Sequence, residues 1–165
     1  MMLSGYSVAH AFSHHFFRRI FMSKGLGVLL VDDDPGIRSA LTLWAQLEKV
    51  RLYTFETAEA FLFAQKSGRF SFESNPTHGE PITHALIDLT LPGMSGDRFI
   101  DYLRPLLPLP RLALITAKQF ELHERLDSDL RKVRVMRKPF ALSDLDDFIA
   151  AGDVNHEPEA GNQSE

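Results

Sequence analysis

The chain has 165 residues, a formal net charge of −4 and no cysteine. This length suits one domain with a proper core, and the lack of cysteine excludes disulfides, thiolate metal sites and cysteine nucleophiles. The negative charge argues against nucleic-acid binding as the main activity, and no apolar stretch approaches the roughly 18 to 20 residues that span a bilayer. We therefore expect a cytoplasmic protein with no direct DNA binding and no membrane partner.

The two ends of the chain differ from the middle in charge and hydropathy. Residues 1–24 carry basic side chains and no acidic one, whereas residues 151–165 carry only acidic ones and no large apolar side chain. We predict that 151–165 is a disordered acidic tail. Residues 1–24 form an extension that is either unstructured, which we favour, or an amphipathic helix for an interface or partner. Met22 would also be a natural first residue. The domain proper then spans 25–150.

The most informative feature is an apolar run that ends in consecutive acidic residues. Residues 28–31 (Val-Leu-Leu-Val) indicate a short strand buried on both faces, typical of a parallel sheet, and Asp32, Asp33 and Asp34 follow it directly. Adjacent carboxylates there cost free energy through desolvation and repulsion unless a cation neutralises them. Mg²⁺, which prefers oxygen ligands, is the obvious candidate. The alternative is a solvated Asp that caps the next helix.

Strand and helix patterns alternate along the rest of the chain. They predict a helix from Pro35, a strand at 51–55, a helix at 58–66 capped by Thr57, a long loop at 67–83, a strand at 85–87, a helix through 99–103, a strand at 112–115, a charged helix at about 119–130, a strand at 133–136 and a last helix opened by Ser143. The buried stripe of the first helix is expected to contain Ile37, Leu41, Trp44 and Leu47. This alternation implies an α/β fold with a doubly wound parallel sheet, right-handed crossovers and helices on both faces.

Polar residues stand at the carboxyl ends of four predicted strands: the acid run after the first, then Asp88, Thr116 and Lys138. In doubly wound sheets the chemistry lies beyond those ends. Each residue has an ordinary alternative as a turn residue, a helix cap or a solvated charge. Together they converge on one rim, which favours a functional site.

These residues, in this order, resemble the receiver domain of two-component response regulators. The matching pieces are Val-Asp-Asp at 31–33, Asp-Leu-Thr-Leu-Pro-Gly-Met-Ser-Gly at 88–96, Ile-Thr-Ala at 115–117 and Lys-Pro-Phe at 138–140. The resemblance implies a flavodoxin-like, five-stranded parallel sheet of order 2-1-3-4-5. It also implies a signalling switch rather than an enzyme, phosphorylated by a sensor histidine kinase or a histidine phosphotransfer protein. Nothing after residue 150 looks like an output domain, so we expect a stand-alone receiver that acts on a downstream protein.

The resemblance also implies roles for the acidic residues. Asp88 would be the phosphoacceptor. Asp33 would bind Mg²⁺ directly and Asp32 mainly through a water molecule, with Asp88 and the backbone carbonyl of Thr90 as further ligands. Asp34 has no such role and is expected to start a helix.

The resemblance implies roles for the last two strand ends as well. Thr116 would donate a hydrogen bond to the phosphoryl group, and Lys138 would pair with a phosphoryl oxygen. Pro139 matches a cis-peptide position of the family.

The chain departs from the family pattern in two places. Val135 stands where the family has a switching aromatic residue, which leaves a rearrangement of the helix predicted at 119–130, through Thr116, as the candidate switch. The loop at 67–83 is longer than usual. The basic stretch at 131–137 is either solvated surface or a docking site for an acidic partner.

Two other functions fit parts of the sequence. A haloacid-dehalogenase-like phosphatase would use the acid run, Thr116, Lys138 and the later acid pair Asp146-Asp147, but it leaves Asp88 unexplained. A receiver-like binding module that no longer takes phosphate is the other alternative.

Overall fold

The computed structural model describes residues 27–68, 72, 81–107, 111–117 and 133–152. The predicted extension 1–24, most of the loop predicted at 67–83, the helix predicted at about 119–130 and the tail from 153 lie outside the described residues. Within the described part of the chain, no helix is long and apolar enough to cross a membrane.

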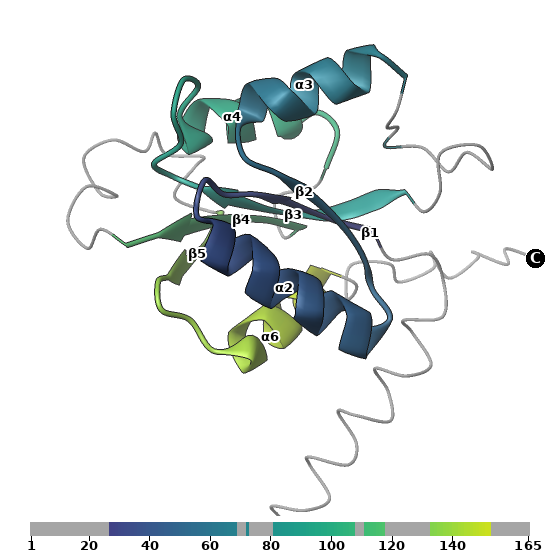
Figure 1. The fold of residues 1–165 in the computed structure, drawn as a ribbon, viewed down its shortest axis with the longest axis vertical. Coiled ribbons are helices and arrows are strands. Elements are labelled where there is room, and N and C mark those ends of the chain that lie inside the picture. Colours follow the sequence, from purple (N-terminus) through teal and green to yellow (C-terminus); the bar gives the residue numbers. More distant parts are fainter. Residues whose placement is uncertain (1–26, 69–71, 73–80, 108–110, 118–132, 153–165) are drawn as a thin grey trace, which may run out of the picture.

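A parallel sheet of five strands, in the order β2-β1-β3-β4-β5, forms the centre of the fold (Figure 1). The strands are β1 (Gly27–Val31), β2 (Arg51–Phe55), β3 (Ile82–Asp88), β4 (Leu112–Thr116) and β5 (Arg134–Arg137). The predicted α/β fold class and strand order are confirmed. β3 starts earlier than predicted because Ile82 and His84 pair with Gly27 and Val28 of β1.

Helices cover both faces of the sheet (Figure 1). The helices α2 (Pro35–Glu48) and α6 (Leu142–Gly152) lie on one face, and α3 (Ala58–Lys66) and α4 (Gly96–Leu103) lie on the other. Each face has its own buried cluster, one around Phe61 and Phe99 and the other around Trp44 and Phe148. The three central strands β1, β3 and β4 are therefore largely shielded from water, whereas the edge strands β2 and β5 keep exposed residues.

The start of α2 agrees with the sequence, but its last turn does not. The Asp34 carboxylate caps the helix and accepts the Gly36 N–H at 2.7 Å, as expected of a helix-start acid. Leu41 and Trp44 are buried as predicted, whereas Leu47 is 72% exposed. Leu47 lies about a third of a turn round the helix from the centre of the buried face, so its place in the predicted stripe was wrong.

The last helix begins before Ser143, which was predicted to open it. α6 starts at Leu142, and the carboxylate of Asp144 accepts the Ala141 N–H at 2.9 Å. Asp144 therefore satisfies the backbone N–H that precedes the helix, at Ala141, two positions before Ser143. In α3 the predicted cap is correct, since Thr57 Oγ1 accepts the Ala60 N–H at 3.0 Å.

Candidate functional site

The predicted site residues meet at the carboxyl edge of the sheet. Asp32 follows β1 directly, Asp88 and Thr116 are the last residues of β3 and β4, and Lys138 follows β5. Parallel strands deliver all these ends to the same rim, so four separate stretches of sequence supply one cluster.

Three carboxylates form the acidic part of this cluster. Asp32, Asp33 and Asp88 each offer an oxygen atom, and these atoms all lie within 4.8 Å of one another. Asp32 is fully buried and Asp88 is nearly so, while Asp33 is exposed. The exposed member leaves one side of the cluster open to solvent, where a ligand can enter.

Backbone amides orient the two buried carboxylates. Oδ1 of Asp32 accepts the Asp34 N–H at 2.9 Å, and Oδ1 of Asp88 accepts the Thr90 N–H at 2.8 Å. Hydrogen bonds from N–H groups stabilise the ionised form of a carboxylate. Each acid therefore has one oxygen held by its own turn and a second that faces the cluster.

Lys138 is the cation paired with the buried carboxylates. Its Nζ atom lies 2.5 Å from Oδ2 of Asp88 and 2.8 Å from Oδ2 of Asp32. Its backbone N–H donates to the carbonyl of Thr116 at 2.8 Å, and the Lys138–Pro139 peptide bond is cis. The lysine is thus anchored to β4 at its backbone and to β1 and β3 at its tip.

Burial and charge act in opposite directions on these groups. Burial raises the pKa of Asp32 above its ordinary value, and the contact with Lys138 offsets only part of this effect. Burial also works to lower the pKa of Lys138, but the carboxylates of Asp32 and Asp88 outweigh it, so that pKa lies above its ordinary value. One ammonium group therefore faces three carboxylates, and this oxygen-only donor set with excess negative charge fits a hard divalent cation.

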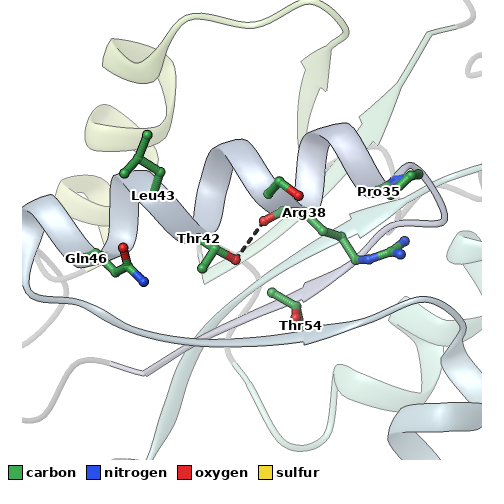
Figure 2. A pocket seen from close by; sticks show the side chains of 7 residues that line it. Pro35, Arg38, Thr42, Leu43, Gln46 and Thr54 are labelled. Carbon is green, nitrogen blue, oxygen red and sulfur yellow. Dashed lines mark hydrogen bonds between the residues drawn. The ribbon is translucent and has the colours of Figure 1, made fainter.

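Arg38 also contacts the site, and the sequence did not reveal it. Its Nη1 atom donates to the backbone carbonyl of Asp32 at 2.7 Å. The side chain lies beside a shallow groove between α2 and β2 (Figure 2), whose lining residues are Pro35, Arg38, Ser39, Thr42, Leu43, Gln46 and Thr54. Arg38 lies in the first turn of the helix that follows the acid run. This nearness to the acid run is the one sequence feature that could have indicated a contact with the site.

The close approach of α4 to Asp88 requires a glycine at 96. A Cβ atom on Gly96 would lie 2.0 Å from the carbonyl oxygen of Asp88. The Gly96 N–H instead donates to the carbonyl of Leu89 at 3.1 Å. The second glycine of the 88–96 segment therefore lets the helix start directly against the backbone of the predicted phosphoacceptor.

The acid pair that the phosphatase alternative requires lies away from the strand ends that form the cluster. Asp146 and Asp147 fall within α6 rather than at a strand end. This is a poor match to the strand-end acid pair that a haloacid-dehalogenase-like phosphatase would need. Val135, at the position of the missing aromatic residue, lies on the edge strand β5 and is 37% exposed.

Solved structures similar to this one are mostly response regulator receiver domains. A CheY-like receiver domain protein from Methanospirillum hungatei JF-1 matches with a TM-score of 0.59 and 22% identity, over 75% of this chain and 90% of that chain. The chain therefore has the receiver-domain fold. No protein-family model and no curated protein matches the sequence.

Two further structures show how broadly this receiver fold occurs. The response regulator TrrA from Thermotoga maritima, in complex with Mg²⁺-BeF, has a TM-score of 0.56 and 24% identity, covering 76% of this chain and 97% of that one. An adenylate cyclase from Rhodopirellula baltica has a TM-score of 0.58 and 25% identity, covering 76% of this chain and 85% of that one. Proteins with different named activities thus share this fold. The function of this chain must therefore be argued from its site.

Proposed function

We propose that this receiver fold accepts a phosphoryl group on Asp88 and signals through altered protein contacts. The observation that carries the proposal is the position of the Asp88 carboxylate. It lies at the rim of the sheet, in contact with Lys138 and within 4.8 Å of oxygens from Asp32 and Asp33. A carboxylate nucleophile beside a cation and two further oxygen ligands is the equipment that phosphoryl transfer requires.

The reaction forms one bond and breaks another at phosphorus. An oxygen of Asp88 attacks the phosphorus atom, and the bond from phosphorus to the donor breaks, with its electron pair leaving on the donor group. The product is an acyl phosphate on Asp88. When the donor is a phosphohistidine of a sensor kinase or a phosphotransfer protein, the broken bond is P–N.

Lys138 and Thr116 serve the phosphoryl group in this proposal. The ammonium of Lys138, now paired with Asp88, moves its contact to a phosphoryl oxygen, and the Thr116 hydroxyl donates to another. Mg²⁺ bound by Asp32, Asp33, Asp88 and the Thr90 carbonyl would neutralise charge on the transferred group. The buried position of Thr116 at the end of β4 makes it the coupling point to the segment that follows.

Signalling requires that phosphorylation favour one of two conformations. Because Val135 supplies no aromatic ring on β5, we assign the switch to Thr116 and the chain beyond β4. The partners are a phosphodonor protein and a downstream protein target, and the setting is the cytoplasm.

The test is phosphorylation of the full chain by a small phosphodonor. The protein is incubated with acetyl phosphate and Mg²⁺, and the intact mass is measured with and without hydroxylamine. We expect one hydroxylamine-labile phosphate, lost in Asp88→Asn and retained in Asp101→Asn, a matched control on the exposed side of α4. Steady release of phosphate with the label on Asp32 would indicate a phosphatase instead, and no label would indicate a binding module.

A further inference from the structure

The segment between the predicted phosphoacceptor and α4 is tied to a different helix. This segment, residues 89–95, is called the acceptor loop below. Oε1 of Glu59, in the first turn of α3, accepts the backbone N–H of Met94 at 2.7 Å. The contact joins residues that are 35 positions apart, and it lies at the same rim as Asp88, since α3 starts just after the carboxyl end of β2.

Gly93, next to Met94, lies directly beside the Glu59 carboxylate. It has a φ of +76°, and a Cβ atom there would lie 2.6 Å from Oε1 of Glu59 and 3.0 Å from its Cδ. The carboxylate therefore lies against the bare backbone of Gly93 while it accepts the next N–H. The hydrogen bond to Met94 and the close approach to Gly93 place the same carboxylate of Glu59 against the acceptor loop.

The other end of the loop is held by the sheet. The Leu89 N–H donates to the carbonyl of Ile115 in β4 at 2.8 Å, and the Thr90 N–H donates to Oδ1 of Asp88. Leu91 is buried in the core on the α3 and α4 side. Thr90, whose carbonyl is the proposed metal ligand, thus lies in a loop anchored by β4 on one side and by Glu59 on the other.

We propose that Glu59 is a positioning residue for this site. By holding Met94 and Gly93, it fixes the path of the acceptor loop, and so the placement of the Thr90 carbonyl beside Asp88. The inference rests on the proposed function, in which that carbonyl and that carboxylate act together. Glu59 itself touches neither the metal nor the phosphoryl group.

The test compares three variants of the full chain. Glu59→Ala removes the acceptor, Glu59→Gln keeps an amide oxygen in the same place, and Glu56→Ala removes an exposed charge from the same β2–α3 connection without touching the loop. The dissociation constant for Mg²⁺ is measured by calorimetry, and amide exchange at Met94 and Thr90 is measured by NMR without metal. Unfolding in urea is followed for each variant, to separate positioning from general instability.

We expect Glu59→Ala to weaken Mg²⁺ binding about three- to tenfold, since a hydrogen bond to a charged group is lost, and to speed exchange at both amides. Glu59→Gln should recover most of the affinity, and Glu56→Ala should resemble the unmodified chain. Equal weakening in Glu59→Ala and Glu56→Ala would overturn the inference, as would unchanged exchange at Thr90.

The exchange measurement keeps this inference separate from the proposed function. If the unmodified chain binds no Mg²⁺, the proposed role of Mg²⁺ in the function is wrong. Faster exchange at Thr90 in Glu59→Ala, restored by Glu59→Gln, would still support the positioning role in the metal-free protein.

Discussion

Lys138 and Asp88 lie 50 positions apart in the sequence, yet Nζ of Lys138 lies 2.5 Å from Oδ2 of Asp88. The same Nζ atom contacts Asp32, so one lysine neutralises acids from two different strands. In the proposed phosphorylation this pair would have to separate in part for a phosphoryl group to reach Asp88. The lysine therefore has a structural role in this site, and the proposed function gives it a chemical role as well.

Removal of the Lys138 ammonium should destabilise the protein. In Lys138→Met the buried carboxylates of Asp32 and Asp88 lose their cation, and we expect the free energy of unfolding near neutral pH to fall by about 1–3 kcal/mol. Urea unfolding measures the loss, and added Mg²⁺ should recover part of it. An unchanged unfolding midpoint would show that the ion pair contributes little.

The same lysine should matter more for signalling than for metal binding. We expect Lys138→Met to bind Mg²⁺ almost as well as the unmodified chain, while phosphorylation-dependent binding to a partner is largely lost. Equal losses in the two assays would contradict the role assigned to Lys138.

The substitution Asp33→Asn should raise the stability of the protein without metal and lower its affinity for Mg²⁺. In Asp33→Asn the repulsion within the acid cluster falls, so the metal-free protein should become slightly more stable. Its Mg²⁺ affinity should drop by about tenfold or more, because an oxygen ligand with full charge is lost. Calorimetric titration and thermal unfolding of the same sample test both signs, and a loss of stability without metal would count against the repulsion.

His84 should make stability depend on pH below neutrality. Burial, helped by the charge of Arg111, lowers the pKa of His84 to about 4 from its ordinary value of 6.5. Between these two values the unfolded chain binds the proton and the folded chain does not. Stability should therefore be complete above about pH 6.5 and fall as pH drops toward 4, by up to about 3 kcal/mol.

The variant His84→Gln isolates this contribution. The raised pKa of Asp32 acts with the opposite sign at low pH, but it is common to both proteins. Urea unfolding from pH 7 to 4 should show a smaller loss in His84→Gln than in the unmodified chain. Parallel curves would remove His84 as the cause.

Gly96 should tolerate no side chain. Gly96→Ala would place a methyl group 2.0 Å from the Asp88 carbonyl oxygen, and the helix or the strand end must shift to relieve this. We expect a loss of about 2–4 kcal/mol in the free energy of unfolding. Gly68→Ala is a suitable comparison, because it has positive φ but no atom within 4 Å, and its cost should be only about 1 kcal/mol. A loss at Gly96 no larger than that at Gly68 would mean that the contact with Asp88 adds little to the cost.

Much of this architecture could be predicted because the strand ends are chemically distinctive. Buried apolar runs end in or just before Asp32, Asp88, Thr116 and Lys138. Parallel strands place such ends at one edge of the sheet, independently of the conformation of the connecting loops. The fold class could be predicted because strand and helix patterns alternate along the chain, which implies a parallel sheet covered by helices.

The misses come from contacts that depend on three-dimensional placement. Leu47 fits the helical spacing but lies too far round α2 from the sheet. The helix α6 starts before Ser143, and Asp144 accepts the N–H of Ala141 just ahead of it. Arg38 and Glu59 act on backbone groups of other segments, at Asp32 and Met94. Neither contact follows from the apolar spacing or from the strand ends on which the prediction relied. That of Glu59 joins residues 35 positions apart, so only the structure reveals it.

The most direct test of the central claim is to locate the phosphoryl group on the chain. After incubation with acetyl phosphate and Mg²⁺, borohydride reduction converts a phosphoaspartate to homoserine, and peptide mass spectrometry identifies the position. The account predicts homoserine at 88 only, dependent on Mg²⁺ and absent without the phosphodonor. Homoserine at 32 or 33, or at no position, would contradict it.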